Sequence, residues 1–345
     1  MIHCGADVHS KSTHLTILSG RGVELFSGPV PTERVALQAA LRPYAKKGVR
    51  VIQETGASQA FIQSVFGEIG IDVVTVHASD MKMITRSKKK TDKRDSYQLA
   101  WHSLKDNLPE PVYVPTQEEQ DLRALLSAHE RARKGRTALS NGVRGQLKRY
   151  GILLPQGFLT KESGWTALHE TDLSPAMRII VEASFAMWME HTRAMELLSA
   201  EMRDRTKEDD LVRRLKTIPN VGDGCAVAVR AYLADLRRFH GRRAVVSYAG
   251  FCPSQHDTGD RHVTGRITKQ GPSRIRAVFV QAAHLLIGRK FKGLPHWRGW
   301  YERLLHAKDR RNKAVVAVAR RLYLLAYQVG RSGDVYRPPA EEGRN

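Results

Sequence analysis

Three things are scarce in this sequence: cysteine, long apolar runs and motifs for nucleotide or zinc chemistry. Cys4, Cys225 and Cys252 are its only cysteines and lie far apart, which excludes a disulfide framework and a paired zinc knuckle and favours the reducing cytoplasm. No apolar run approaches the roughly 20 residues of a membrane helix, so an integral membrane protein is excluded. We expect no signal peptide from the segment MIHCGADVHSK, and no Walker, dinucleotide-binding or H-E-x-x-H motif occurs.

Acidic residues are too few to balance the basic ones. The 345 residues include 56 Lys and Arg but only 35 Asp and Glu, which gives a formal net charge of +21 and a pI of about 10.1. Such an excess points to a polyanionic partner, most often a nucleic acid, although a ribosome-associated or merely basic protein stays open. Apolar residues make up 41%, enough for a core, which excludes wholesale disorder.

Residues 1–115 have the pattern of an α/β domain, in which apolar segments of strand length precede and alternate with amphipathic stretches. The predicted elements are strands at His3–Val8, Thr13–Leu18 and Val23–Phe26, a helix from Thr32 that ends or kinks at Pro43, a strand at Val49–Gln53, a helix at Ser58–Ile69, a strand at Val73–Val76 and a helix starting near Thr91. Three hairpin strands followed by alternating helices and strands are the element order of the ribonuclease-H-like fold.

Residues 116–205 are predicted to be helical. Apolar residues recur at heptad spacing in two stretches, the first from Gln117 and the second behind the N-cap and N1 pair Ser174-Pro175. The second stretch carries the stripe Met177, Val181, Ser184, Trp188, His191, Met195, Leu198 and Met202. Such stripes predict long paired helices or a coiled coil. A hairpin packed within its own domain and an arm that joins two subunits both stay open.

Residues 206–335 are predicted to form a third, mostly helical domain, followed by a flexible tail at 336–345. The segment Leu215–Ala226 resembles a helix-hairpin-helix, in which backbone N–H groups at Gly222 and Gly224 grip a DNA phosphate. A plain tight turn is the alternative. We interpret Ser254–Ser273, which is rich in Gly, Thr and basic residues, as a loop, and Asn312–Val329 as the closing helix.

Four acidic residues occupy positions that the ribonuclease-H-like fold brings together. Asp7 lies in the first strand, Glu54 follows the fourth, and Asp92 and Asp95 share one face at a helix start. Clustered carboxylates bind Mg²⁺ or Mn²⁺, and a pair of such ions clamps a scissile phosphate. Helix-dipole complementation and turn positions are the alternatives. His9 lies near Asp7, and we interpret it as a solvent-exposed or packing histidine rather than a ligand.

A basic segment surrounds the two helical aspartates. Lys88, Lys89, Lys90 and Arg94 are predicted to contact phosphates beside the cleaved bond, because lysine and arginine neutralise the nucleic-acid backbone. A solvated run of charge is the alternative, since these residue types are exposed on most proteins without any partner.

Two blocks of motifs resemble one family along nearly the whole chain. Asp7, Glu54-Thr55-Gly56 and Lys90-Thr91-Asp92-Lys93-Arg94-Asp95 resemble the first half of the DEDD signature of bacterial insertion-sequence transposases, which are relatives of the Piv invertase. Segments 248–259 and 265–276 resemble the second half of that signature. Both blocks occur in the order of the family, which makes the resemblance specific.

The resemblance implies a RuvC-like DEDD domain at 1–115, a coiled coil at 116–205 and a transposase domain at 206–335. It implies that the four acids hold Mg²⁺ (or Mn²⁺) while a protein hydroxyl attacks a phosphodiester and forms a covalent protein–DNA intermediate. The position of that hydroxyl is Thr258 here, where the family typically has Ser, and Ser254 is the alternative. The basic residues near it that are expected to contact nucleic acid are Arg261, Arg266, Lys269 and Arg274.

The implied partners are double-stranded donor and target DNA, a guide non-coding RNA, and further copies of the chain in a dimer or tetramer. The implied location is the bacterial cytoplasm, at the nucleoid during the reaction. We therefore predict a DNA recombinase of a mobile insertion sequence. Two other functions stay open: a RuvC-like junction nuclease that uses water as its nucleophile, and a non-catalytic basic protein that holds RNA or DNA as a scaffold.

Overall fold

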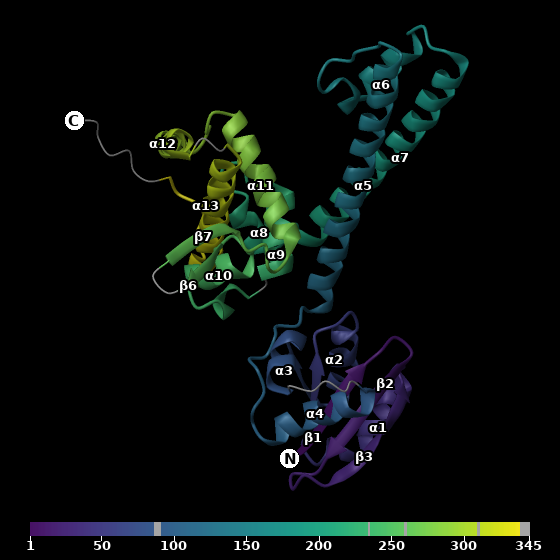
Figure 1. The fold of residues 1–345 in the computed structure, drawn as a ribbon, viewed down its shortest axis with the longest axis vertical. Coiled ribbons are helices and arrows are strands. Elements are labelled where there is room, and N and C mark those ends of the chain that lie inside the picture. Colours follow the sequence, from purple (N-terminus) through teal and green to yellow (C-terminus); the bar gives the residue numbers. More distant parts are fainter. Residues whose placement is uncertain (86–90, 234, 259–260, 309–310, 339–345) are drawn as a thin grey trace, which may run out of the picture. The chain divides into compact units, whose positions relative to one another are not determined.

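The computed structural model describes residues 1–85, 91–233, 235–258, 261–308 and 311–338 (Figure 1). The chain divides into two compact units, Met1–Gln117 (unit 1) and Glu118–Asn345 (unit 2). Among the described residues, every cluster of buried apolar side chains lies within one unit. None of the helices in these ranges is long and apolar enough to cross a membrane.

Unit 1 contains a five-stranded mixed sheet in the order β3-β2-β1-β4-β5. Its strands are β1 (Ile2–Val8), β2 (Ser12–Leu18), β3 (Glu24–Pro31), β4 (Val49–Glu54) and β5 (Asp72–Val76). The β1–β2 and β2–β3 pairs are antiparallel, whereas β1–β4 and β4–β5 are parallel. Because Ala6 of β1 stands opposite Gln53 of β4, Asp7 and Glu54 come next along two adjacent parallel strands.

Helices cover both faces of this sheet. They are α1 (Arg34–Ala45), α2 (Gln59–Gly67), α3 (Ala78–Thr85) and α4 (Asp92–Leu104). Side chains alternate along β4, so Val51 packs in the cluster with α1 and α2, while Ile52 packs with Met81 and Leu99 on the opposite face. The predicted β-β-β-α-β-α-β-α order is confirmed, with α3 as one helix more than the sequence pattern predicts.

Two predicted elements of unit 1 have other boundaries in the structure. β3 does not end at Phe26 but continues to Pro31. Proline lacks the backbone N–H that a strand donates to its neighbour, but β3 lies at the edge of the sheet, so the sheet loses no hydrogen bond there. α1 follows Glu33 rather than a Thr32 cap, and it continues past Pro43 to Ala45. The hydroxyl of Thr32 instead donates to the carbonyl oxygen of His9 at 2.8 Å.

Unit 2 begins with a hairpin of two long helices (Figure 1). These are α5 (Gln117–Arg149) and α7 (Pro175–Thr206). The hydroxyl of Ser174 caps α7 by accepting from the N–H of Met177 at 3.3 Å. Met177, Val181 and Trp188 of the heptad stripe share a buried cluster with Val143 of α5. Intramolecular packing of this part of the stripe is therefore confirmed.

The linker between the two long helices carries structure that the sequence pattern does not predict. It contains the 3-10 turn Phe158–Thr160 and the helix α6 (Glu162–His169). Trp165 of α6 is buried, and its ring stacks on Phe185 of α7 with centroids 5.7 Å apart. Its indole N–H donates to the carbonyl oxygen of Leu159 at 3.1 Å. This small core closes the end of the helical hairpin.

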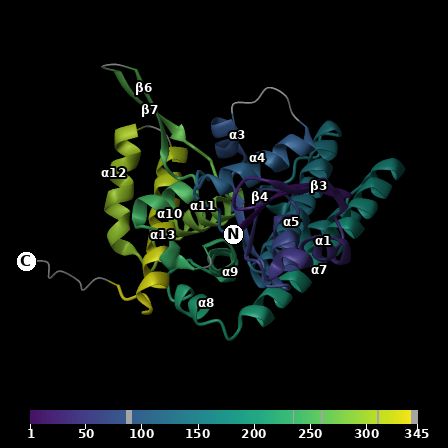
Figure 2. The ribbon, with the colours of Figure 1, turned by 90° about the horizontal axis from the view of Figure 1, so that it is seen from below.

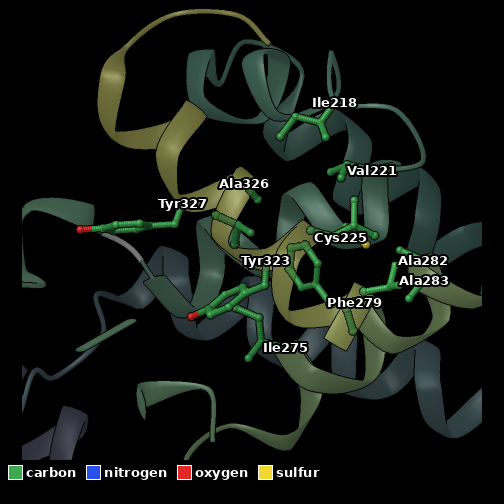
Figure 3. Close-up of a cluster of buried hydrophobic side chains, with 14 of the residues drawn as sticks. Ile218, Val221, Cys225, Ile275, Phe279, Ala282, Ala283, Tyr323, Ala326 and Tyr327 are labelled. Carbon is green, nitrogen blue, oxygen red and sulfur yellow. The ribbon is translucent and has the colours of Figure 1, made fainter. Parts of the chain in front are cut away.

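The rest of unit 2 is mostly helical. Its elements are α8 (Asp210–Leu215), α9 (Asp223–Leu233), the 3-10 turn Leu236–Arg238, α10 (Arg242–Tyr248), β6 (Pro253–Thr258), β7 (Arg261–Ile267), α11 (Ser273–Gly288), the 3-10 turn Pro295–Trp297, α12 (Arg298–Lys308) and α13 (Arg311–Ser332). Its core gathers Ile218, Val221, Cys225, Phe279 and Tyr323 (Figure 3). The predicted closing helix is confirmed as α13.

The hairpin helices and this helical part share buried residues. Leu122 and Leu126 of α5 and Met202 of α7 form one cluster with Val227 and Ala231 of α9. The proposed boundary at residues 205 and 206 therefore separates elements that pack on one another within unit 2.

The interpretation of 254–273 as a loop is wrong, because most of it forms a β-hairpin. β6 and β7 pair antiparallel, with Asp257 opposite His262 and Thr258 opposite Arg261. Figure 2 shows the two strands extending away from α10 and α13. The strands carry few apolar residues, so the alternation that marks a half-buried strand is missing from the sequence.

Candidate metal centre and nucleic-acid-binding segments

Close packing of α4 on the sheet positions two of the predicted acidic residues. Gly5 of β1 is buried, and a Cβ atom there would collide with the backbone carbonyl oxygen of Ser96 in α4. The hydroxyl groups of Ser96 and Thr16 lie 2.7 Å apart across the same contact. The hydroxyl of Thr91 caps the helix by accepting from the N–H of Arg94 at 3.3 Å. The first turn of α4 is thereby fixed beside the end of β1.

Asp7, His9 and Asp92 form a compact group at this position. The Nε2 atom of His9 lies 3.2 Å from Oδ2 of Asp7 and 3.5 Å from Oδ1 of Asp92. One ligand-type atom from each of the three residues lies within 4.8 Å of the others. The side chain of Asp7 is 23% exposed, whereas those of His9 and Asp92 are 49% and 61% exposed. The residue of the group that lies on the strand is thus mostly buried, and the residue on the helix is mostly exposed to solvent.

The electrostatics of the group concentrate on Asp7. Burial raises the pKa of the Asp7 carboxyl above its ordinary value, and the charges of Asp92 and Asp95 raise it further, while the contact with His9 opposes the shift. Negative charge is therefore disfavoured where the carboxylates meet, and a cation bound there would relieve the repulsion.

The other two predicted acids lie next to this group. Asp95 is one turn along α4 from Asp92 and is close enough to act on the charge of Asp7. Glu54 is the last residue of β4, one position beyond the Ala6–Gln53 pair that joins β4 to β1. The structure thus gathers Asp7, Asp92 and Asp95 and carries Glu54 on the neighbouring strand end.

The donor atoms fit a divalent cation. Carboxylate oxygens are the ligands that Mg²⁺ and Mn²⁺ prefer, and an imidazole nitrogen suits Mn²⁺ and other transition metals. His9 is the member that the sequence interpretation set aside as a packing or solvent-exposed residue. The signal for it is its place in the segment Asp7-Val8-His9, only two positions beyond the predicted ligand Asp7.

The predicted phosphate contacts beside the metal group are placed only in part. Lys88, Lys89 and Lys90 lie outside the described residues. Arg94 is exposed in the first turn of α4, between Asp92 and Asp95. The role of these cations in DNA binding stays a prediction.

The glycine-bearing turn before α9 leaves its backbone accessible. A Cβ atom added at Gly222 or Gly224 would meet nothing within 4 Å, so packing inside the protein does not require glycine at either position. Asn220 in the same turn has φ of +65°, and Lys216 pairs with Asp223 at 2.7 Å. The turn joins α8 to α9, as a helix-hairpin-helix would, and its role as a phosphate grip stays a prediction.

The two candidate nucleophiles lie at different places on β6. Ser254 is near the base of the hairpin, and its hydroxyl faces Gly265 of β7 so closely that a Cβ atom there would collide with it. Thr258 is the last residue of β6, paired with Arg261. The side chains of Thr258 and Arg261 lie outside what the structure describes.

The remaining predicted cations differ in their surroundings. Arg266 and Lys269 are exposed. Arg274 lies 3.6 Å from the carboxylate of Glu130 in α5, with only 20% of its side chain exposed, so it already has a partner within unit 2. The sequence reasoning gave no role to Arg276, whose guanidinium donates to the carbonyl oxygens of Ala249 and Gln270 at 2.9 and 2.8 Å. Arg276 fixes the base of the hairpin.

Comparisons with known proteins match two segments of the chain. A family model described as "Transposase IS116/IS110/IS902 family" matches residues 212–301, and a DEDD-type transposase model matches residues 4–152. The chain is 25% identical to the transposase for insertion sequence element IS1111A of Coxiella burnetii over 92% of this chain and 87% of that protein. It is 26% identical to a probable family 20 transposase of Pseudomonas aeruginosa, over 67% of this chain and 69% of that protein. It is 22% identical to the pilin gene-inverting protein of Moraxella bovis, over 75% and 71%.

Proposed function

The chain belongs to the IS116/IS110/IS902 family of transposases, and from that premise we propose that it cuts and rejoins the DNA of an insertion sequence with Mg²⁺ (or Mn²⁺) and a hydroxyl nucleophile of its own. It is an enzyme of DNA strand transfer. The observation that carries the metal-dependent mechanism is the meeting of Asp7 and Asp92 at the end of β1, with Asp95 acting on the same charge.

The carboxylates would hold the metal, which supplies Lewis-acid stabilisation of the charge on the attacked phosphate. Asp7 lies on the buried strand, and Asp92 and Asp95 lie on the helix packed against it. Their geometry is therefore set by the fold before DNA arrives, and such preorganisation is the main source of electrostatic catalysis. Glu54 completes the predicted set from the adjacent strand end.

The nucleophile in this proposal is the hydroxyl of Thr258, with Ser254 as the alternative. The hydroxyl gives up its proton as its oxygen bonds to phosphorus, the bridging oxygen of the DNA strand leaves and takes up a proton, and the new phosphodiester keeps the bond energy for rejoining. The hydroxyl of Ser254 is turned toward Gly265 in the base of the hairpin, which favours Thr258 at the end of β6.

The nucleic-acid partners in the proposal are double-stranded donor and target DNA and a guide non-coding RNA. The net charge of +21 supports a long polyanionic partner. Two sets of residues offer phosphate contacts that do not depend on the DNA sequence. They are the exposed cations Arg94, Arg266 and Lys269 and the open glycines Gly222 and Gly224. Recognition of the correct site would then fall to base pairing with the RNA.

The assembly in the proposal is a dimer or tetramer in the bacterial cytoplasm, at the nucleoid. Beside the stripe that packs inside unit 2, α7 carries a second apolar row that faces outward. Ile180, Met187 and Leu197 of this row are 43%, 50% and 71% exposed. They recur at spacings of seven and ten residues, which fit a seam between helices of two copies. Sedimentation equilibrium of the full chain measures this association.

The test of the mechanism is DNA cleavage by the full chain on a plasmid that carries its gene with the native flanking DNA. Asp7→Ala and Asp92→Ala are expected to lower Mg²⁺-dependent cleavage by on the order of 10³-fold and to leave DNA binding intact. Asp72→Asn is the matched control, because Asp72 is an exposed acid at the opposite end of the parallel strands.

Three outcomes separate the functions. Cleavage with a covalent protein–DNA adduct supports the recombinase. Metal-dependent cleavage without an adduct rejects the recombinase and supports the junction nuclease that uses water as its nucleophile. Undiminished cleavage in both alanine variants removes the metal group of Asp7 and Asp92 from the mechanism. No cleavage by the wild type with any divalent cation leaves the basic scaffold.

A further inference from the structure

The turn between β1 and β2 holds His9 in a fixed position. The N–H of His9 donates to the carbonyl oxygen of Ser12 at 3.1 Å, and its own carbonyl oxygen accepts from the hydroxyl of Thr32 at 2.8 Å. That hydroxyl lies 2.9 Å from the hydroxyl of Thr13. Both backbone groups of His9 are thereby engaged, so the sheet fixes the backbone from which its ring leaves the turn, and the ring itself lies within hydrogen-bond distance of Asp7.

The ring then places Nε2 at the spacing of a metal ligand. Two adjacent ligands on an octahedral ion with bonds of about 2.1–2.2 Å stand about 3 Å apart. Nε2 lies 3.2 Å from the Asp7 oxygen and 3.5 Å from the Asp92 oxygen, and the three atoms are mutually within 4.8 Å. Two sides of this triangle, at 3.2 and 3.5 Å, are thus close to the spacing that adjacent ligands of one ion require.

We propose that His9 is a direct ligand of a metal ion that it shares with Asp7 and Asp92, and that this nitrogen makes the site favour Mn²⁺ over Mg²⁺. The proposal rests on the metal-dependent function proposed above and deepens it by naming a ligand outside the four acids. Mg²⁺ binds oxygen ligands almost exclusively, whereas imidazole is a good ligand for transition metals. A site with one imidazole and two carboxylates should therefore bind Mn²⁺ more tightly than Mg²⁺.

The exposure of the three side chains agrees with a shared ion. Asp7 is the most buried of the three, and the side chains of His9 and Asp92 are about half or more exposed. An ion in contact with all three would retain open coordination positions toward the exposed side, where a phosphate oxygen can bind. A histidine that served only to pack the turn would have no need to face both carboxylates.

The experiment measures binding of Mn²⁺ and of Mg²⁺ to the full chain by titration calorimetry, for the wild type, His9→Ala, His9→Gln and His14→Ala. Both His9 variants are expected to lower Mn²⁺ affinity by about tenfold or more and Mg²⁺ affinity by less than about threefold. His14→Ala is the matched control, because His14 stands opposite Asp7 on β2 but its ring lies by Ser27.

A second readout is made first on the wild type. Pulsed electron paramagnetic resonance of the Mn²⁺-loaded wild type is expected to show the nuclear modulation of a bound nitrogen, which changes when the histidines carry ¹⁵N and is absent in His9→Gln. No nitrogen modulation in the wild type, or equal Mn²⁺ affinity in wild type and both His9 variants, overturns the proposal.

The metal function itself is judged on separate variants. If Asp7→Asn and Asp92→Asn abolish binding of both cations while His9→Gln changes neither, the carboxylate site stands and only the histidine ligand is rejected. If the wild type binds neither cation, the proposed function fails as well.

Discussion

Asp7 and Asp92 are carried by a strand and a helix that meet in a buried contact, whereas Ser254 and Thr258 lie on a two-stranded hairpin whose strands pair only with each other. A two-stranded hairpin is marginally stable by itself. The base of this one is fixed by Arg276 and by the tight packing of Gly250 against the backbone of Lys269 and Gln270. The proposed metal group is thus held by a buried contact, whereas the proposed nucleophile lies on a hairpin that Arg276 and Gly250 fix at its base.

In the proposed mechanism, this contrast would hold the enzyme inactive. The metal group and the separately carried hydroxyl would react only when both reach the same phosphate, so DNA would have to bind to unit 1 and unit 2 at once, in one chain or in two. The following changes test each side of the contrast, from the largest expected effect to the smallest.

Removal of the nucleophile should have the largest effect. Thr258→Ala is expected to lower strand exchange by about 10³-fold or more and to abolish the covalent adduct, while Thr258→Ser keeps both, since it retains the hydroxyl and loses the crowding methyl group. Gel analysis of protein–DNA adducts measures the result. If Thr258→Ala keeps full strand exchange and Ser254→Ala loses it, the nucleophile is Ser254 at the base of the hairpin. The contrast between a fixed metal group and a separately carried nucleophile would then be wrong.

Disruption of the α4 contact should come next. Gly5→Ala places a methyl group against the backbone of Ser96, which cannot rotate away as a side chain would. We expect a loss of stability of about 2–3 kcal/mol and weaker metal binding, because Asp92 and Asp95 move with the helix. Chemical denaturation of the full chain gives the free energy of unfolding. Gly67→Ala is the control, since its added Cβ would meet nothing within 4 Å, and an equal loss there would refute the packing argument.

The salt dependence of DNA binding should distinguish exposed from engaged cations. Arg266→Ala and Lys269→Ala are each expected to reduce the slope of log affinity against log salt by about 0.9 on duplex DNA. Arg274→Ala should leave the slope unchanged, because Arg274 is paired with Glu130. Fluorescence anisotropy over a salt series measures the slopes. A reduced slope for Arg274→Ala alone would place the phosphate contacts on the helical core and not on the hairpin.

The smallest expected effect is a gain in stability. The pKa of Asp7 is higher in the folded protein than in the unfolded chain, so the protonated acid stabilises the fold. This contribution is complete at pH values below the pKa of Asp7 in the unfolded chain, and it is lost as the pH rises through the pKa of Asp7 in the folded protein. At neutral pH the ionised Asp7 is therefore unfavourable, and Asp7→Asn should raise the Tm of the metal-free protein by about a few degrees. Added Mn²⁺ should raise the Tm of the wild type but not of Asp7→Asn. A lower Tm in the metal-free variant would contradict this account.

The sequence predicts the strands of unit 1 and the positions of its acids well, because both follow from local patterns. β1, β2, β4 and β5 are apolar runs of strand length, and Thr91 is a recognisable cap before Asp92. The sequence alone does not place His9 beside Asp92, because the two lie 83 positions apart along the chain and the turn that carries His9 is fixed by Thr32.

What the sequence does not predict lacks a local pattern. β6 and β7 have few apolar residues to alternate, so only the pairing of the two strands reveals them. The helix α6 is short, and its amphipathic face is completed by Phe185 and Trp188 from α7. The heptad stripe predicted that α7 pairs with a helix but not which one, since periodicity is the same for a partner in the chain and for one in another copy.

The absence of a side chain at Gly5 has a consequence for the inheritance of this gene. Gly5 touches no DNA and binds no metal in our proposal, yet the helix with Asp92 and Asp95 can take its place only where that side chain is missing. Copies of a mobile element decay by mutation once they stop moving. A copy that keeps all four acids but has lost this glycine is therefore expected to be immobile, although its sequence still contains the four acids.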